Sequence, residues 1–223
     1  MSATVTGAGR KRAAVLISGR GSNMAALVEA AAQPGFPAEI ALVLSNRADA
    51  AGLDFAKAHG IPTKVLSHKG FADRQAFDEA LDGVLRDEGI EIVCLAGFMR
   101  LLTPWLVERW RDRMINVHPS LLPAFKGLHT HERALDLGVR FHGCTVHFVR
   151  AEMDEGPIIL QAAVPIEADD TPDVLAARVL TQEHLIYPKG LELLAAGRLS
   201  VADERVAITG VEPGLKPLIA PKV

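Results

Sequence analysis

Three features are scarce in this 223-residue sequence, and each scarcity argues against a class of protein. There are two cysteines, Cys94 and Cys144, each in an apolar run, so we expect core thiols of a cytoplasmic protein and no disulfide. No apolar stretch approaches the ~20 residues of a membrane helix, and no cleavage site follows the first run, which argues against a membrane protein and a signal peptide. Basic residues are not in excess, and the net charge of −3 predicts neither a nucleic-acid partner nor an anionic membrane surface.

The sequence does contain apolar runs that alternate with amphipathic segments. A long helix should extend from Thr171-Pro172 toward Gly197, kinked or divided at Pro188. The alternation predicts an α/β fold: a doubly wound, mostly parallel sheet of about seven strands with helices on both faces, similar to a Rossmann fold. The runs expected to form strands are 13–18, 39–45, 63–66, 90–96, 114–117, 143–149 and 158–166.

A single domain should account for most of the chain, because this length is most simply one domain with its own core. Residues 1–12 are expected to be a disordered leader, and residues 13–198 the domain. Residues 199–223 have weak periodicity, so we expect a C-terminal tail that packs on the domain or trails from it. Both a monomer and a homodimer are compatible with the sequence.

A glycine-rich turn, Gly19-Arg20-Gly21-Ser22-Asn23, joins the first expected strand to a helix. Glycines let the backbone approach a ligand, and a helix start presents unpaired N–H groups, so the turn predicts an anion site for a phosphate monoester. A dinucleotide site is disfavoured, because Ala25-Ala26 stand where a third glycine would lie and no acidic residue follows the second strand. Arg47 could suit a 2′-phosphate, which keeps NADP as a weaker alternative, and a tight turn that binds nothing is another.

Polar residues end the strand expected near residue 117, in the segment Asn116-Val117-His118-Pro119-Ser120-Leu121-Leu122-Pro123. Asn116 and His118 should share one face of that strand, an uncharged donor beside a group that titrates near neutrality. Asp154, in Asp154-Glu155-Gly156-Pro157, is a candidate partner for the imidazole. Taken singly, His118 would more often be a core histidine bonded to a carbonyl, and Asp154 could equally cap a loop.

These motifs resemble the folate-dependent formyltransferases. Within them, Ile17–Asn23 and the segment Gly127-Leu128-His129-Thr130-His131 look like the phosphoribosylglycinamide (GAR) formyltransferases, and the likeness runs from about Ala13 to Gly197. The resemblance implies a cytoplasmic enzyme of de novo purine biosynthesis that moves the formyl group of 10-formyltetrahydrofolate to the amine of GAR, with no metal. It also implies that Asn116 and a protonated His118 stabilise the oxyanion, that Asp154 assists proton transfer, and that the Leu122-Pro123 peptide is cis.

The resemblance further implies which residues contact the two substrates. The positions that match the GAR site are Gly21, Ser22, Asn23, Met99, Val117 and Glu183. The positions that match the folate site are Arg74, Met99, Arg100, Leu101, Leu102, Val107, Asn116, Val149, Ala151, Glu152 and Asp154. Arg74 would meet the glutamate tail of the folate, whereas Glu183 would hold the amino end of GAR. From pattern alone, Met99 and the leucines would be core residues, and Arg74 and Glu183 solvated helix residues.

Several other functions compete with GAR formylation. A 10-formyltetrahydrofolate deformylase shares Asn116, His118 and Asp154, but it normally has an N-terminal regulatory domain for which we expect no room here. A methionyl-tRNA formyltransferase would need a C-terminal RNA-binding domain and a basic face. A hydride-transferring enzyme and a non-catalytic nucleotide sensor are more distant possibilities. A zinc site is disfavoured, because its candidate ligands lack the spacing of structural sites; they are His129, His131, His142 and His147.

Overall fold

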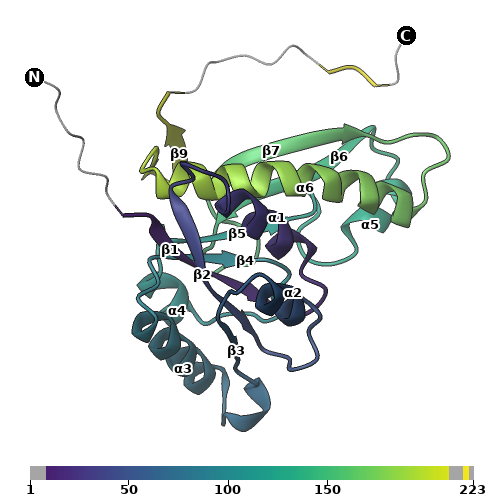
Figure 1. The fold of residues 1–223 in the computed structure, drawn as a ribbon. Coiled ribbons are helices and arrows are strands. Elements are labelled where there is room, and N and C mark those ends of the chain that lie inside the picture. The colour runs from purple at the N-terminus through teal and green to yellow at the C-terminus, as the bar shows by residue number, and fades with distance from the viewer. Residues whose placement is uncertain (1–8, 211–217, 221–223) are drawn as a thin grey trace, which may run out of the picture.

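The computed structural model describes residues 9–210 and 218–220 as alternating strands and helices (Figure 1). The strands are β1 (Lys11–Ile17), β2 (Ala38–Ser45), β3 (Thr63–Val65), β4 (Ile92–Leu95), β5 (Met114–His118), β6 (Phe141–Phe148), β7 (Ile158–Pro165), β8 (Leu199–Ala202) and β9 (Arg205–Ile208). The helices are α1 (Ser22–Ala31), α2 (Gly52–Ala58), the 3-10 helix η1 (His68–Gly70), α3 (Arg74–Asp87), α4 (Pro104–Arg109), α5 (Thr130–Asp136) and α6 (Pro172–Ala195).

Seven strands form one sheet in the order β3-β2-β1-β4-β5-β6-β7, which confirms the predicted fold class. The first five strands of that order are parallel, and β6 runs antiparallel to both β5 and β7. The chain builds outward from β1 to β3 and then returns to place β4 on the other side of β1. Open α/β sheets bind ligands at the carboxyl ends of the strands beside such a reversal. The expected site is therefore at the ends of β1 and β4.

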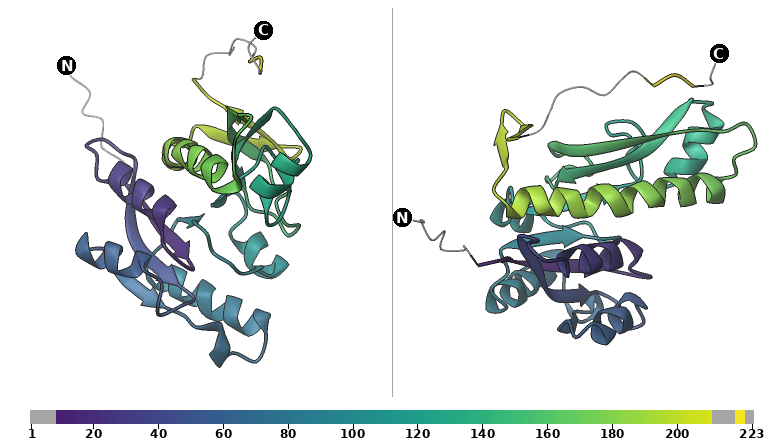
Figure 2. Two further views of the ribbon diagram at one scale, coloured as in Figure 1. Left: turned by 90° about the vertical axis from the view of Figure 1, so that its right-hand side faces the viewer. Right: turned by 45° about the horizontal axis from the view of Figure 1, so that its top comes forward.

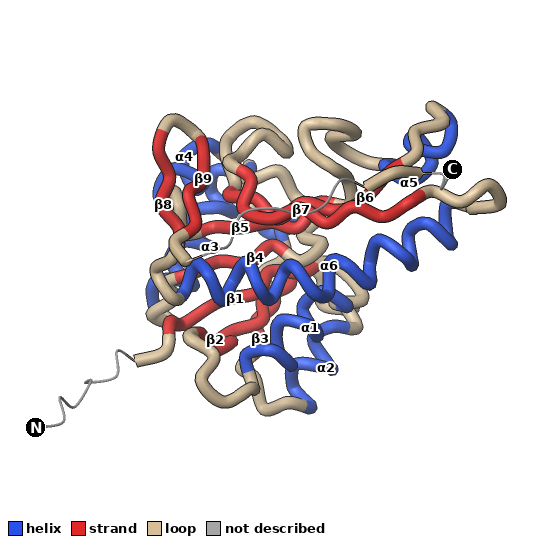
Figure 3. Tube along the Cα trace, turned by 90° about the horizontal axis from the view of Figure 1, so that it is seen from above, coloured by secondary structure: helices blue, strands red, loops and turns tan. Residues whose placement is uncertain are grey.

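Helices cover both faces of the sheet, and each face has its own core. On one face the core includes Met24 and Leu27 of α1 and Tyr187 of α6. On the other face it includes Phe77 and Leu81 of α3, together with Leu85, Leu106 and Trp110. Figure 3 and the right-hand view of Figure 2 show α6 running beside β6 and β7, with α1 next to it. Along α3, the buried apolar residues Phe77, Leu81 and Leu85 recur at every fourth position, as in an amphipathic helix.

The structure shows that Pro188 does not divide the last long helix. Helix α6 is continuous from Pro172 to Ala195, and Pro188 lies inside it. The helix packs against α1, β6 and β7, and its buried face includes Val179, Tyr187 and Leu191. Packing along the whole length holds the helix together across a residue that lacks a backbone donor.

The two ends of the domain also differ from expectation. β1 begins at Lys11 rather than Ala13, because Lys11 and Arg12 pair with β2 and with the carboxylates of Glu91 and Glu39. Residues 199–208, part of the expected tail, form the β8–β9 hairpin, to which the sequence assigned no strands, and Leu199, Val201 and Val206 pack on the domain core. The remaining parts of the expected leader and tail, 1–8, 211–217 and 221–223, lie outside the described residues. Within the described ranges, no helix is long and apolar enough to cross a membrane.

Candidate active site

The loops that follow β1 and β4 are tied together at the edge where the strand order reverses. The Ser18 hydroxyl accepts a hydrogen bond from the Met99 backbone N–H (2.8 Å) and donates one to Asn46 Oδ1 (2.6 Å). Beneath this edge, the buried Tyr187 hydroxyl of α6 contacts the carbonyl oxygens of Leu95 (2.9 Å) and Ile115 (3.2 Å), at β4 and β5. These bonds join three neighbouring strands and both loops into one platform for the site.

The β1–α1 turn has the geometry of an anion site. Gly21 is the N-cap of α1 with φ 78°, and within the described part of the chain no side chain caps this helix start. A Cβ at Gly21 would lie 3.0 Å from the Cα of Gly52, so the turn requires glycine for both its conformation and its close packing. The first N–H groups of the ten-residue helix are thus presented by backbone alone, with the partial positive charge of a helix start.

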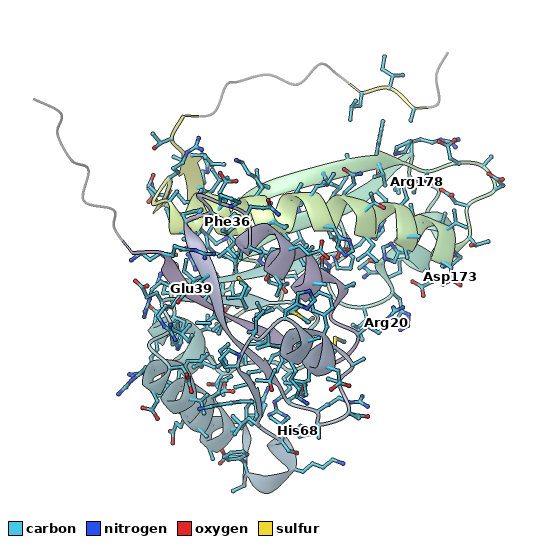
Figure 4. All side chains as sticks on the ribbon, viewed as in Figure 1. Arg20, Phe36, Glu39, His68, Asp173 and Arg178 are labelled. Carbon is cyan, nitrogen blue, oxygen red and sulfur yellow. The ribbon has the colours of Figure 1, made fainter. Side chains whose placement is uncertain are left out.

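Arg20 and Arg47, the two cations next to this turn, do not point into it. The Arg20 side chain is exposed and extends away from the loop (Figure 4). The Arg47 guanidinium makes a two-pronged contact with Asp49, at 3.0 and 2.7 Å. That pairing occupies the group that a 2′-phosphate would need, which weakens the NADP alternative further.

Glu183 lies in the site and not on a solvated helix face. Its side chain is 6% exposed, and its Oε2 accepts a hydrogen bond from Asn23 Nδ2 at 2.5 Å. Burial raises the pKa of Glu183, and the hydrogen bond from Asn23 opposes part of that rise. A carboxylate held in a poorly hydrated place beside the anion turn can bind a cationic or hydrogen-bonding amine.

Asn116, His118 and Asp154 meet at the carboxyl end of β5. His118 Nε2 lies 3.0 Å from the Phe125 carbonyl oxygen, and its Nδ1 lies 3.5 Å from Asp154 Oδ2. Because a carbonyl can only accept, Nε2 carries a proton and Nδ1 is the nitrogen that faces the carboxylate. Asp154 has φ 57°, a left-handed conformation that aspartate adopts more readily than most residues, and its carboxylate accepts the Gly127 N–H at 2.8 Å, which ties it to a second loop.

Gly156 explains the Asp-x-Gly-Pro spacing physically. A Cβ at Gly156 would lie 1.6 Å from the Phe148 carbonyl oxygen, so any side chain there would push the loop away from β6. The Phe148 N–H also donates to the Pro157 carbonyl at 2.9 Å, which closes this loop at its base. The glycine therefore lets the chain turn back tightly enough to aim Asp154 at His118.

His147 is a residue of the site that the sequence reasoning missed. Its Nδ1 donates to the Phe148 carbonyl (3.0 Å), so Nε2 is left to accept from Asn116 Nδ2 at 3.2 Å. Burial lowers the pKa of His147 to about 4, so the ring stays neutral and keeps this acceptor near pH 7. The sequence offered no signal for this role, because it depends on the pairing of His147 with Asn116 across the β5–β6 ladder, a register that only the fold reveals.

The segment between β5 and α5 is held by hydrogen bonds from β6 and β7. Thr145 Oγ1 donates to the Ser120 carbonyl (2.7 Å) and accepts the Leu122 N–H (3.0 Å). Gln161 Nε2 donates to the Leu122 carbonyl at 2.9 Å. The Leu122-Pro123 peptide is cis, as the family resemblance implied. This scaffold positions the Phe125 carbonyl, which accepts the hydrogen bond from His118 Nε2.

The residues predicted for folate are divided between exposed and buried positions. Met99 and Leu101 are 64% and 58% exposed, against the core interpretation, whereas Val107 is buried and Arg74 is exposed at the start of α3. Arg100 lies over the Phe77 ring, 4.3 Å from its centroid. Val117, predicted for GAR, packs in the core on the face of α1 and α6 and pairs with Val146 of β6. A cleft of ≈ 500 Å³ includes Val107, Ala151 and Glu152 in its lining.

The four histidines considered as zinc ligands separate into different environments. His129 is exposed and lies near Glu132, whereas His147 is the partner of Asn116. His131 and His142 pack edge to face with centroids 5.1 Å apart, and burial lowers the pKa of His142 to about 4. No group of three or more His, Cys, Asp or Glu side chains among the described residues is arranged to hold a metal ion.

Comparison with known proteins gives a consistent set of relatives. The family described as formyl transferase matches residues 11–191. The chain is similar to the phosphoribosylglycinamide formyltransferase of Escherichia coli K12, at 45% identity over 88% of this chain and 92% of that protein. It is also similar to the crystal structure of glycinamide ribonucleotide transformylase 1 from Symbiobacterium toebii, with a TM-score of 0.87, 46% identity, and 89% and 94% of the two chains covered.

Two further similarities bear on function more loosely. The chain is 50% identical over 194 residues to the trifunctional purine biosynthetic protein adenosine-3 of Homo sapiens. The matched region covers 87% of this chain and about a fifth (19%) of that relative's length. It also resembles a formyltetrahydrofolate deformylase from Pseudomonas syringae, with a TM-score of 0.84, 26% identity, and 90% and 66% of the two chains covered. The first relative is therefore much longer than this chain, and the second is more distant in sequence.

Proposed function

The chain belongs to the formyl transferase family, and from this premise we propose that it transfers the formyl group of 10-formyltetrahydrofolate to the amine of GAR. The products are formyl-GAR and tetrahydrofolate, in a step of purine biosynthesis. One observation carries the proposal. A backbone anion site and the cluster of Asn116, His118 and Asp154 lie at the same edge of one sheet, so a phosphorylated amine and a formyl donor can meet there.

In the proposed reaction the GAR amine attacks the formyl carbon directly. The new C–N bond forms, the carbonyl oxygen becomes an oxyanion, and collapse of the tetrahedral intermediate breaks the bond to N10. Asn116 contributes an amide N–H to the oxyanion. A protonated His118, whose Nε2–H is donated to Phe125, contributes its positive charge and its Nδ1–H, which lies 3.5 Å from Asp154. The amine loses a proton and N10 gains one, and Asp154, 3.5 Å from His118, assists that transfer. No covalent bond between enzyme and substrate is needed.

The substrate positions follow the same geometry. The N–H groups at Gly21, Ser22 and Asn23 hold the ribose phosphate, and the buried carboxylate of Glu183 holds the amino end of GAR. The exposed Met99 lies where its backbone is fixed by Ser18, between the two substrates. Of the remaining folate positions, Val107, Ala151 and Glu152 line the cleft of ≈ 500 Å³, and Arg74 begins α3. The others proposed for the folate are Arg100, Leu101, Leu102 and Val149.

We also propose that the protein works in the cytoplasm. Cys94 and Cys144 are both buried free thiols, and burial raises the pKa of each to about 12. Such thiols are core residues of low reactivity, as is typical of proteins kept in a reducing compartment.

The test is turnover of 10-formyltetrahydrofolate by purified protein, with and without GAR, followed by the absorbance of the deformylated folate. Turnover that requires GAR, with formyl-GAR detected by mass spectrometry, is the expected result. Turnover without GAR would mean that water takes the place of the amine, and the deformylase alternative, which the similarity of fold supports, would replace the proposal. Absence of turnover under both conditions would reject both activities.

A further inference from the structure

Arg150 is an arginine with an unusually enclosed side chain, directly before the loop of Ala151, Glu152 and Asp154. Its side chain is 8% exposed, although arginines are mostly exposed in folded proteins. Its guanidinium donates to Glu204 Oε2 (2.6 Å), Asp112 Oδ1 (2.7 Å) and the Val149 carbonyl (3.1 Å). The three acceptors come from the C-terminal hairpin, the turn before β5 and the end of β6, so one side chain joins three segments.

Glu204 lies in the two-residue turn of the β8–β9 hairpin, where its backbone is strained. Asp203 and Glu204 have φ values of 49° and 54°, which is the geometry of a turn in which glycine or asparagine is usual. A glutamate adopts this left-handed conformation only at an energetic cost, because its Cβ crowds the following carbonyl oxygen. The carboxylate of this strained residue meets two cations, since Arg111 also donates to its Oε1. The hydrogen bond from Arg150 is the main cause of the lowered pKa of Glu204, so the group stays charged near neutral pH.

The β8–β9 hairpin that carries Glu204 is itself held in place by packing and by a hydrogen bond at its base. Leu199, Val201 and Val206 pack against the main core. Arg198, at the base, donates through Nε to the Thr209 carbonyl at 2.9 Å, which closes the open end of the hairpin. Arg111, which follows α4, donates to Glu204 and so ties the turn to the end of that helix. The turn is therefore held in place from both ends while its tip carries Glu204.

The cleft of ≈ 500 Å³ brings the two sets of residues together. One part of its lining is Val107, Ala151 and Glu152, proposed above for the folate, and another part is Arg111, Arg150 and Glu204. Three consecutive residues of the loop, 151–153, are exposed, so packing alone does not hold them. At its far end the loop is held by Asp154, which accepts the Gly127 N–H. Arg150 is the corresponding attachment at the near end.

We propose that Glu204, acting through Arg150, is a positioning residue for folate binding. The hairpin fixes Glu204, Glu204 with Asp112 fixes the guanidinium, and Arg150 fixes the backbone of the loop that reads the folate. This inference rests on the proposed function for the identity of the ligand, but the anchoring contact itself does not depend on it. Neither Glu204 nor Arg150 needs to touch the reacting atoms.

The test uses Glu204→Gln and, as its control, Asp203→Asn in the full-length protein. Both changes remove one negative charge from the same turn, but in the described residues the Asp203 carboxylate makes no ion pair. We expect Glu204→Gln to raise the KM for 10-formyltetrahydrofolate about 3- to 10-fold, with the KM for GAR and kcat changed less than about 2-fold. Asp203→Asn should leave all three constants near those of the wild type.

Two further measurements keep the outcome clear. Amide hydrogen exchange should be faster at residues 151–153 in Glu204→Gln than in Asp203→Asn, whether or not the protein acts on folate. The double variant Arg150→Met/Glu204→Gln should bind folate no more weakly than Arg150→Met, because the glutamate acts through the arginine. Unchanged folate KM and exchange in Glu204→Gln would overturn the inference, as would a loss of kcat with unchanged folate KM. If the wild type failed to use 10-formyltetrahydrofolate, the proposed function would be wrong. The hydrogen-exchange data would still test whether Glu204, through Arg150, holds residues 151–153 in place.

Discussion

The two halves of the sheet contribute to the site by different means. In the parallel half, the turn after β1 presents backbone N–H groups; Gly21 is required for its shape, Arg20 points away, and only Asn23 uses its side chain, to hold Glu183. In the half where β6 runs antiparallel, the site is made of side chains that fix one another: Asn116 with His147, and His118 with Asp154. A backbone site tolerates many substitutions outside its glycine, whereas a site made of paired side chains tolerates few. The proposed roles, phosphate binding and proton transfer, follow this division.

The largest effect on kcat should come from substitutions of the paired side chains His118 and Asp154. We expect His118→Ala and Asp154→Asn to lower kcat about 10²–10⁴-fold, because each removes a group from proton transfer or oxyanion stabilisation. Steady-state kinetics with both substrates measures this, and thermal unfolding checks that the fold is retained. Near-normal kcat in either folded variant would remove that residue from the proposed mechanism.

Removing His147, the hydrogen-bond partner of Asn116, should have the next largest effect on kcat. His147→Leu leaves the Asn116 amide without its acceptor, and we expect kcat to fall about 10-fold or more. His147→Gln can still accept and should lose less. Equal losses in both variants would mean that packing, and not the hydrogen bond, is what His147 provides.

His147 also predicts a dependence of stability on acidity. Its pKa in the folded state is about 4, below the ordinary value of 6.5, so its contribution to stability is present above pH 6.5 and is lost as pH falls toward 4. Unfolding in denaturant between pH 7 and pH 4 should therefore show a smaller loss of stability in His147→Gln than in the wild type. Parallel losses in the two proteins would contradict the assigned pKa.

The backbone half is tested by adding one methyl group. Gly21→Ala and Gly60→Ala both place alanine at positive φ, which by itself costs about 1–2 kcal/mol of unfolding free energy, and close contacts add to the loss only at Gly21. At Gly60 nothing lies within 4 Å of the new Cβ, whereas at Gly21 it meets Met24 and Gly52. We expect only Gly21→Ala to raise the KM for GAR, about 10-fold. A similar rise in Gly60→Ala would point to general destabilisation.

Glu183 lies between the two halves and should show a trade between stability and binding. Because burial raises its pKa, its favourable contribution is full below pH 4.5 and is lost as pH rises through its folded-state pKa. Glu183→Gln should therefore unfold at a modestly higher temperature than the wild type at pH 8, while its KM for GAR increases. Lower stability at pH 8 with unchanged KM would contradict both statements.

The smallest effect is expected at Arg20. Its side chain extends from the anion turn into solvent (Figure 4), so Arg20→Ala should change the KM for GAR less than about 2-fold. The measurement is initial rate against GAR concentration at low and moderate salt. A large rise in KM would show that the guanidinium reaches the phosphate and that the site is not made by backbone alone.

The sequence by itself determined the elements and the order in which they occur. Apolar runs and amphipathic spacing predicted the seven-stranded sheet, and the motifs around Gly21, His118 and Asp154 predicted where polar residues gather. These features are local, because strand pattern, turn glycines and helix caps depend on neighbours within a few residues. The hairpin of residues 199–208 escaped prediction because its turn is Asp203-Glu204, which is not a usual turn pair.

Only the tertiary structure decided which distant residues meet. The pairing of His147 with Asn116 depends on the β5–β6 register, and the burial of Glu183 depends on α6 packing against α1. Pro188 did not divide α6, because contacts along the helix outweigh one missing donor. Arg150, Asp112 and Glu204 are far apart in sequence and come together through three separate elements. Long-range contacts of this kind carry no periodic signal along the chain, so burial, pKa and hydrogen-bond partners could be assigned only from the fold.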